Sequence, residues 1–315
     1  MKPSTARSAN TVRYFYDDLA ADYDLMYADW DASIARQAAA LSALIGEAVL
    51  AGTAAPGGGG AGQGEAARPG GGTRSGDEDV AYDVLDCACG IGTQALGLAA
   101  LGYRVTGSDL SPAAVSRAAK EAASRGIGLR VAAADMTQLP FRDASFDVVV
   151  CADNSLPHLL TPEAVVAALG EMRRVLRPGG VLLLSTRPYD RLRRERPGST
   201  PPQMREGADG RVVTFQLWHW QPDGERYDLE HFQLRPGTSA ESGAEGEGET
   251  GERWGVRTRR TSYWALSQAQ IVEFTARAGL REPVWHEPDE SGFFQPVLVV
   301  RRPEAVVKVT GHDHI

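Results

Sequence analysis

The chain has few cysteines and no apolar segment at its start. Three cysteines in 315 residues, two of them one residue apart, do not make the disulfide framework of a small secreted domain. The first five residues lack the apolar core of a signal peptide, and no apolar run approaches the length of about 18 residues that a membrane span needs. These absences predict a cytoplasmic protein with no membrane partner.

Basic charge is also scarce. The net charge is −8 at pH 7, and the sequence pI is near 5.4. A polyanion attracts basic surfaces, so this balance argues against a nucleic-acid partner. No second cysteine pair accompanies Cys87 and Cys89, and we therefore expect no metal site and read them as small buried residues of a tight loop.

Large apolar residues are missing from two stretches, 51–79 and 237–252, which are rich in Gly with Ala or with Ser, Thr and Glu. Neither stretch can bury enough apolar surface to offset the entropy of ordering, so both are predicted to be flexible insertions. They divide the chain into an N-terminal helical lid segment (1–50), the first insertion (51–79), a cofactor-binding core (80–190), an antiparallel elaboration with closing strands (191–302, which contains 237–252) and a tail (303–315).

Strands and helices alternate between residues 80 and 186. Ser111-Pro112 and Thr161-Pro162 each combine a hydroxyl N-cap with proline at the first helical position. Arg177-Pro178-Gly179-Gly180 reads as a turn into a last strand. This alternation predicts a doubly wound, mostly parallel sheet. The expected strands are 80–87, 103–108, 129–133, 146–151 and 181–186.

The pattern changes after residue 187. Segments 211–220, 227–234 and 254–264 alternate in polarity and carry many aromatic residues, as antiparallel strands do. A capping box at Ser267 and Gln270 predicts a helix that ends at Gly279. Closing strands are expected at 281–286 and 296–301, and a 3–4 apolar spacing predicts an N-terminal helix over 34–48.

A glycine loop follows the first strand of the core. Gly90-x-Gly92-x-x-Ala95 also satisfies the dinucleotide fingerprint, so a nicotinamide oxidoreductase is one interpretation. Asp109, at the end of the next strand, is placed to accept both hydroxyls of an adenosine ribose. Asp86, just before the loop, would repel a pyrophosphate but would favour the ammonium and sulfonium of S-adenosylmethionine. The three features together predict S-adenosylmethionine as the cofactor.

The segment 80–186 resembles the class I S-adenosylmethionine-dependent methyltransferases. Besides the loop, the resemblance rests on Ala134-Asp135-Met136 after the third strand. It implies an enzyme with a Rossmann-like sheet of seven strands, in which Asp135 binds the adenine amino group and Met136 packs on the ring. From the residues alone, Asp135 could instead be a loop carboxylate that caps backbone amides.

Three further segments are similar to glycine N-methyltransferase and the bacterial glycine/sarcosine N-methyltransferases: residues 151–159, 177–180 and 185–190. This resemblance implies methyl transfer to the amine of a small amino acid such as glycine or sarcosine. Acceptor-side residues would be Asn154 at the substrate, Arg187 as clamp for its carboxylate, His158 closing the site and Tyr263 in the chamber. Cofactor-side residues would be Tyr23, Trp30, Arg36, Asp86, Ala88, Gly90, Gly92, Asp109, Leu110, Asp135, Met136 and Ala152.

Other interpretations of the acceptor side stay open. Arg187 could be a surface arginine at a strand end, and His158 a packing or capping histidine. Asp153 stands where glycine is usual in the resembled family, and its charge would attract a cationic amine or indicate a different substrate. The alternatives are a methyltransferase for another small metabolite, a nicotinamide oxidoreductase and a non-catalytic cofactor-binding subunit. A homo-oligomer is one option for the assembly.

Overall fold

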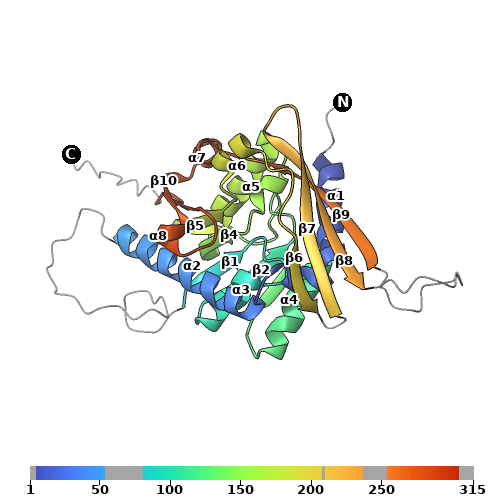
Figure 1. Ribbon diagram of the computed structural model, residues 1–315. Coiled ribbons are helices and arrows are strands. Elements are labelled where there is room, and N and C mark those ends of the chain that lie inside the picture. The colour runs from blue at the N-terminus through green and yellow to red at the C-terminus, as the bar shows by residue number, and fades with distance from the viewer. Residues whose placement is uncertain (1–4, 54–80, 208–209, 237–253, 305–315) are drawn as a thin grey trace, which may run out of the picture.

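The computed structural model of the chain describes residues 5–53, 81–207, 210–236 and 254–304. Its centre is a seven-stranded sheet in the order β10-β11-β5-β4-β1-β2-β3, where β11 runs antiparallel to both of its neighbours and the pairs from β5 to β3 are parallel (Figure 1). The strands are β1 (Asp83–Asp86), β2 (Arg104–Asp109), β3 (Arg130–Ala133), β4 (Phe146–Cys151), β5 (Leu176–Ser185), β10 (Arg281–His286) and β11 (Val297–Arg301).

Helices cover both faces of this sheet. Apolar side chains of α2 and α3 pack with one face, and those of α5 and α7 pack with the other. The doubly wound, mostly parallel fold predicted from the sequence is therefore confirmed. The helices are α2 (Trp30–Thr53), α3 (Thr93–Ala100), α4 (Pro112–Ser124), α5 (Pro162–Val175), α7 (Gln268–Arg277) and the short α8 (Pro288–Ser291).

The helix starts follow from the capping residues. The Ser111 side chain accepts a hydrogen bond from the amide of Ala114, and Thr161 does the same for Ala164. Ser267 and Gln270 form the reciprocal capping box. Each bond satisfies an amide that the first turn of a helix leaves without a partner. The predicted starts of α4, α5 and α7 are thus confirmed.

The predicted turn at Arg177-Pro178-Gly179-Gly180 was wrong. These residues lie inside β5, which begins at Leu176 opposite Phe146 of β4 and resumes regular pairing at Val181. The glycines let the extra residues bulge out of the strand: Gly179 has φ +78°, and a Cβ on Gly180 would lie 2.8 Å from the carbonyl oxygen of Asp147. A sequence typical of a turn therefore forms a bulge within a strand of the central sheet.

Helix α2 is longer and more apolar than the sequence analysis assumed. Its stretch Trp30–Leu50, with a mean hydropathy of 1.2, is long and apolar enough to cross a membrane by length and composition, so the expectation that no segment reaches this limit was wrong. Half of that stretch is buried within the protein, and α2 packs against α3. A helix that covers a sheet face meets the same criteria without a membrane.

Close packing of α2 on α3 depends on Gly97. A Cβ at this position would lie 2.6 Å from the Cβ of Ala38 and 2.7 Å from the carbonyl oxygen of Ile34. We expect Gly97→Ala to destabilise the protein by about 1–3 kcal/mol through overpacking, measured by urea unfolding. Gly46→Ala in α2, where nothing lies within 4 Å, is the matched control and should be neutral or stabilising by up to about 1 kcal/mol. Equal effects of the two substitutions would contradict this account.

A second, antiparallel sheet stands beside the central one (Figure 1). Helix α1 packs against its strand β9, where the Arg259 guanidinium, only 2% exposed, donates to the Asp18 carboxylate at 2.6 Å. The predicted antiparallel elaboration and N-terminal helical segment are both present. The remaining elements are α1 (Thr5–Leu19), η1 (Ala20–Met26), η2 (Leu156–His158), α6 (Tyr189–Glu195), β6 (Gln203–Gly207), β7 (Gly210–Trp220), β8 (Arg226–Pro236) and β9 (Trp254–Trp264). Most of the first predicted insertion (54–79), the whole of the second (237–252) and residues 305–315 of the tail lie outside the described residues.

Candidate functional site

Asp86 ends β1 and is fully buried. Its Oδ1 accepts a hydrogen bond from the amide of Ala88 at 3.3 Å, whereas its buried Oδ2 has no partner within the part of the chain that the structure describes. Burial raises the pKa of this carboxyl from 3.8 to about 7. A buried carboxylate oxygen without a donor is the group that a ligand ammonium would satisfy.

Asp109 ends β2, next to β1, and contacts the glycine loop directly. Its two oxygens accept hydrogen bonds from the amides of Gly90 at 2.9 Å and Ser111 at 2.8 Å, and burial raises the pKa of this carboxyl. Gly90 and Gly92 have φ of +52° and +101°, a conformation that glycine adopts without strain. The hydrogen bond from Gly90 therefore holds the glycine loop against the end of β2, and Leu110 is the residue that follows this strand.

Asp135 follows β3 in the same row of strand ends. Its Oδ1 accepts hydrogen bonds from the amide and hydroxyl of Thr137, at 2.8 Å and 2.7 Å. This is the capping role that the sequence left open, so the expected adenine contact stays a prediction. Met136 packs against the apolar cluster that contains Cys87 and Leu139. The carboxylates that end β1, β2 and β3 thus lie along one edge of the sheet, as an adenosine ligand with an ammonium would require.

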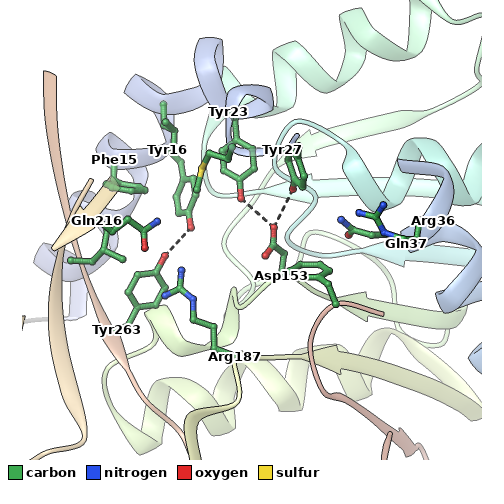
Figure 2. A pocket seen from close by; sticks show the side chains of 14 residues that line it. Phe15, Tyr16, Tyr23, Tyr27, Arg36, Gln37, Asp153, Arg187, Gln216 and Tyr263 are labelled. Atoms are coloured by element: carbon green, nitrogen blue, oxygen red, sulfur yellow. Dashed lines mark hydrogen bonds between the residues drawn. The ribbon is translucent and has the colours of Figure 1, made fainter. Parts of the chain in front are cut away.

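A cavity of about 290 Å³ opens between the loops after β4 and β5, the N-terminal segment and the antiparallel sheet, and Asp86, Asp109 and Asp135 are not among its lining residues. Figure 2 shows Tyr23 and Tyr27 on the N-terminal side, with Asp153 between them and Arg187. The cavity-lining residues used below come from α1, η1 and the residue after η1 (Tyr16, Tyr23, Tyr27), from α2 (Arg36), from the loops after β4 and β5 (Asp153, Arg187) and from β9 (Tyr263). It is therefore built from segments far apart in the chain.

Arg187 follows β5 and is fixed by aromatic residues. Its Nη1 donates to the Tyr227 hydroxyl at 2.6 Å, and its guanidinium lies 4.9 Å and 5.0 Å from the ring centroids of Trp218 and Tyr263. The Asn154 side chain accepts from the Arg187 amide at 3.1 Å. The guanidinium is thus oriented by uncharged groups, and its charge is available to an anionic ligand in the cavity.

Asp153 follows β4 in an unusual backbone conformation. It has φ +54° and Asn154 has φ +67°, both in the left-handed region, which aspartate and asparagine enter more readily than other non-glycine residues. Its Oδ2 accepts hydrogen bonds from Tyr27 at 3.2 Å and Tyr23 at 3.4 Å, and Gln295 donates to Oδ1 at 3.4 Å. Burial raises the pKa of this carboxyl, and the positive charge of Arg187 opposes part of that rise.

His158 lies behind the cavity wall. The Tyr16 hydroxyl lies 2.8 Å from its Nε2 and 3.4 Å from the Tyr263 hydroxyl, and Thr261 lies 3.4 Å from its Nδ1. Burial, with the positive charge of Arg187, lowers the pKa of the imidazole to about 3. His158 is therefore neutral at physiological pH and positions Tyr16 through a hydrogen bond.

The structure separates the predicted acceptor residues into two groups. Arg187 and Tyr263 line the cavity, whereas Asn154 and His158 do not and act on it through Arg187 and Tyr16. The predicted cofactor residue Ala152 is buried at the end of β4 beside them. Their roles toward a substrate remain predictions.

The predicted cofactor contacts of the N-terminal segment are also divided. Tyr23 and Arg36 line the cavity, and Arg36 donates to Ser33 at 3.2 Å. Trp30 does not line it; its indole Nε1 donates to Thr93 at 2.9 Å at the start of α3. Trp30 therefore fixes the N-terminal segment to the helix that follows the glycine loop.

Several cavity residues were missed from the sequence. Tyr16 and Tyr27 lie in α1 and just after η1, and the clustering of tyrosines around Tyr23 in this segment was the available signal. Tyr227 was missed because its contact with Arg187 joins strand β8 to a loop 40 residues away. Within the described residues no cluster of three His, Cys, Asp or Glu side chains could hold a metal ion.

Comparison with known proteins shows what the core of the chain resembles. Residues 84–180 match the family model described as "Methyltransferase domain". A glycine/sarcosine N-methyltransferase of Parasynechococcus marenigrum (strain WH8102) is 39% identical over 117 residues, which are 36% of this chain and 41% of that protein. A putative methyltransferase, YqeM, of Bacillus subtilis (strain 168) is 32% identical over 155 residues, 46% of this chain and 62% of that protein. The chain thus spans less than two thirds of the length of the first curated relatives it matches.

A solved structure extends the likeness of fold to almost the whole chain. The sugar N-methyltransferase KedS8 from Streptoalloteichus sp ATCC 53650 has a TM-score of 0.60 at 22% identity, covering 90% of this chain and 93% of that one. The fold is therefore that of the Rossmann-like methyltransferases. The core matches a methyltransferase domain, which decides against the dinucleotide interpretation of the glycine loop.

Proposed function

We propose that this chain, whose residues 84–180 are a methyltransferase domain, uses S-adenosylmethionine to methylate the amine of a small amino acid such as glycine or sarcosine. The main support for this class of acceptor is that Arg187 and Asp153 line the same cavity. A cation and an anion facing one small space suit a molecule that carries both a carboxylate and an amine.

Donor binding would fall to the strand-end carboxylates. The orphaned Oδ2 of Asp86 fits an ammonium, and Asp109 is placed for the ribose hydroxyls. When bound, S-adenosylmethionine supplies an electrophilic methyl group on a cationic sulfonium. The tyrosine rings of the cavity suit such a cation, because their faces carry negative charge density.

The acceptor side has mainly to orient an amine lone pair toward that methyl group. Arg187, fixed by Tyr227 and stacked against two rings, would bind the acceptor carboxylate as a rigid fork. The similarity to a glycine/sarcosine N-methyltransferase supports this acceptor, although it covers 41% of that protein. An amino sugar, as the name of the structural neighbour KedS8 indicates for that protein, would bring no carboxylate to Arg187.

The test is methyl transfer from labelled S-adenosylmethionine to a panel of glycine, sarcosine, dimethylglycine and amines without a carboxylate, read by mass spectrometry. We expect turnover of a carboxylate-bearing amine and weak or no turnover of the others. Turnover confined to amines without a carboxylate would replace the amino-acid acceptor with another small metabolite. Binding of S-adenosylhomocysteine without turnover of any acceptor would favour a non-catalytic cofactor-binding subunit.

A further inference from the structure

Asp153 is an unfavourable residue for the protein to keep at its position. A glycine would adopt φ +54° without strain, whereas aspartate in addition places a partly buried carboxylate on the cavity wall. Such costs persist where the surrounding structure serves a function. The position is also well chosen, because Asp153 follows the central strand β4 at the edge where the cofactor loop lies.

The groups around Asp153 hold the carboxylate without neutralising it. Tyr23, Tyr27 and Gln295 donate hydrogen bonds of 3.2–3.4 Å, which are long for O–H and N–H donors. No salt bridge to Asp153 occurs among the described residues, and Arg187 acts on it through space. The charged and titratable groups that act on it are Arg187, Tyr16, Tyr23, Tyr27 and Tyr263, and Arg36 lines the same cavity.

None of those other groups can take up a proton at neutral pH. Burial raises the pKa of all four tyrosines, so they are protonated, and arginine is always charged. His158, behind Tyr16, has a pKa of about 3 and is a poor base near pH 7. Asp153 is thus the one cavity-lining carboxylate of the described residues.

An amine acceptor needs such a group. An alkylammonium like that of lysine has a pKa of about 10.4, so roughly one amine in a thousand is neutral at pH 7.5. The protonated form has no lone pair with which to attack a methyl group. Resting on the function proposed above, we propose that Asp153 is a catalytic residue that binds the acceptor ammonium and takes its proton.

Proton transfer to Asp153 comes before methyl transfer. The ammonium N–H bond breaks and its proton passes to the Asp153 carboxylate, which becomes a neutral carboxylic acid, while the amine keeps the electron pair. That pair forms the new N–C bond as the S–C bond breaks, and the electrons of the S–C bond stay on sulfur. The methylated ammonium and S-adenosylhomocysteine leave, and Asp153 returns its proton to water.

The test compares pH profiles of kcat/KM for sarcosine, or for the best acceptor of the panel. Asp153→Asn keeps the shape and tolerates the left-handed backbone but cannot take a proton. We expect it to lose about 100-fold or more at pH 7.5, a typical general-base contribution, and to approach the wild type near pH 10, where roughly 30% of the amine is already neutral in solution. Asp143→Asn is the matched control, since that carboxylate is 75% exposed, and it should leave the profile unchanged.

A second variant and a binding measurement exclude a merely structural effect. Asp153→Gly fits the backbone without strain and should show the same loss with no fall in melting temperature. In the complex with S-adenosylhomocysteine, Asp153→Asn should bind sarcosine at least tenfold more weakly at pH 7.5 by calorimetry. A loss of equal size at every pH, or no loss, would overturn the proton-accepting role. A wild type that turns over no amine while binding S-adenosylhomocysteine would instead overturn the proposed function itself.

Discussion

Replacing Arg187 with alanine should raise the KM of the carboxylate-bearing acceptor by about 100-fold or more. Truncating one partner of a buried, hydrogen-bonded charge pair costs about 2–5 kcal/mol, because the other charge stays desolvated without a partner. Arg187 is oriented by Tyr227 at 2.6 Å and by two aromatic rings, so its guanidinium is held in one position as a rigid fork. Steady-state kinetics with sarcosine would measure the effect.

Two further variants sharpen this experiment. Arg187→Lys keeps the charge but loses the bidentate fork, so we expect an intermediate loss. Arg191→Ala, in the adjoining helix α6 and 61% exposed, is the matched control and should behave as the wild type. An acceptor without a carboxylate should be indifferent to Arg187→Ala. An unchanged KM for the amino acid would remove the carboxylate clamp from the proposal.

Asp86→Asn should weaken the binding of S-adenosylhomocysteine by about 100-fold at pH 8. The buried Oδ2 of Asp86 lacks a partner in the described structure, and an amide nitrogen in its place would face the ligand ammonium with a second donor. Because burial raises the pKa of Asp86 to about 7, wild-type affinity should rise with pH and level off above about 7. Calorimetry between pH 5.5 and 8.5 would show this rise in the wild type and its loss in Asp86→Asn.

The same substitution should stabilise the free protein. A carboxyl whose pKa is raised on folding contributes stability below its unfolded value of 3.8, and that contribution is lost as the pH rises through about 7. A rise of about three units corresponds to a penalty on the order of 4 kcal/mol at pH 8. Asp86→Asn should therefore melt at a higher temperature than the wild type at pH 8, with a smaller shift on adding ligand. A lower melting temperature without ligand would indicate a structural role for the ionised carboxylate.

The helix starts that were predicted correctly depend on interactions between residues close together in the sequence. Ser111, Thr161 and the Ser267–Gln270 capping box each fix a helix start through bonds to amides within three residues, so the sequence contains the whole interaction. The bulge at Gly179 and Gly180 could not be predicted, because it depends on how β5 pairs with a strand 30 residues earlier. The same four residues would form a turn in another setting.

The residues of the candidate site also differ in how far the sequence could predict them. Asp86 and Asp109 were assigned correctly to one edge because strand ends in a parallel sheet share an edge. The contacts of Tyr16 with His158 and Tyr263 join residues 142 and 247 positions apart, and no spacing rule reaches that far. Sequence reasoning therefore placed Asp86 and Asp109 at neighbouring strand ends but did not bring together the residues of the cavity.

The residues that line the cavity come from distant parts of the chain, and this affects how related proteins can differ. The loop and strand-end residues from Asp86 to Asp135 lie within 84–180, the segment that matches the methyltransferase family model, whereas Tyr16, Arg187 and Tyr263 lie outside it. Substitutions in α1 or β9 can thus change the cavity wall without changing the glycine loop, and under the proposed function they would alter the acceptor side. Proteins that share residues 84–180 can therefore differ in the residues that line this cavity.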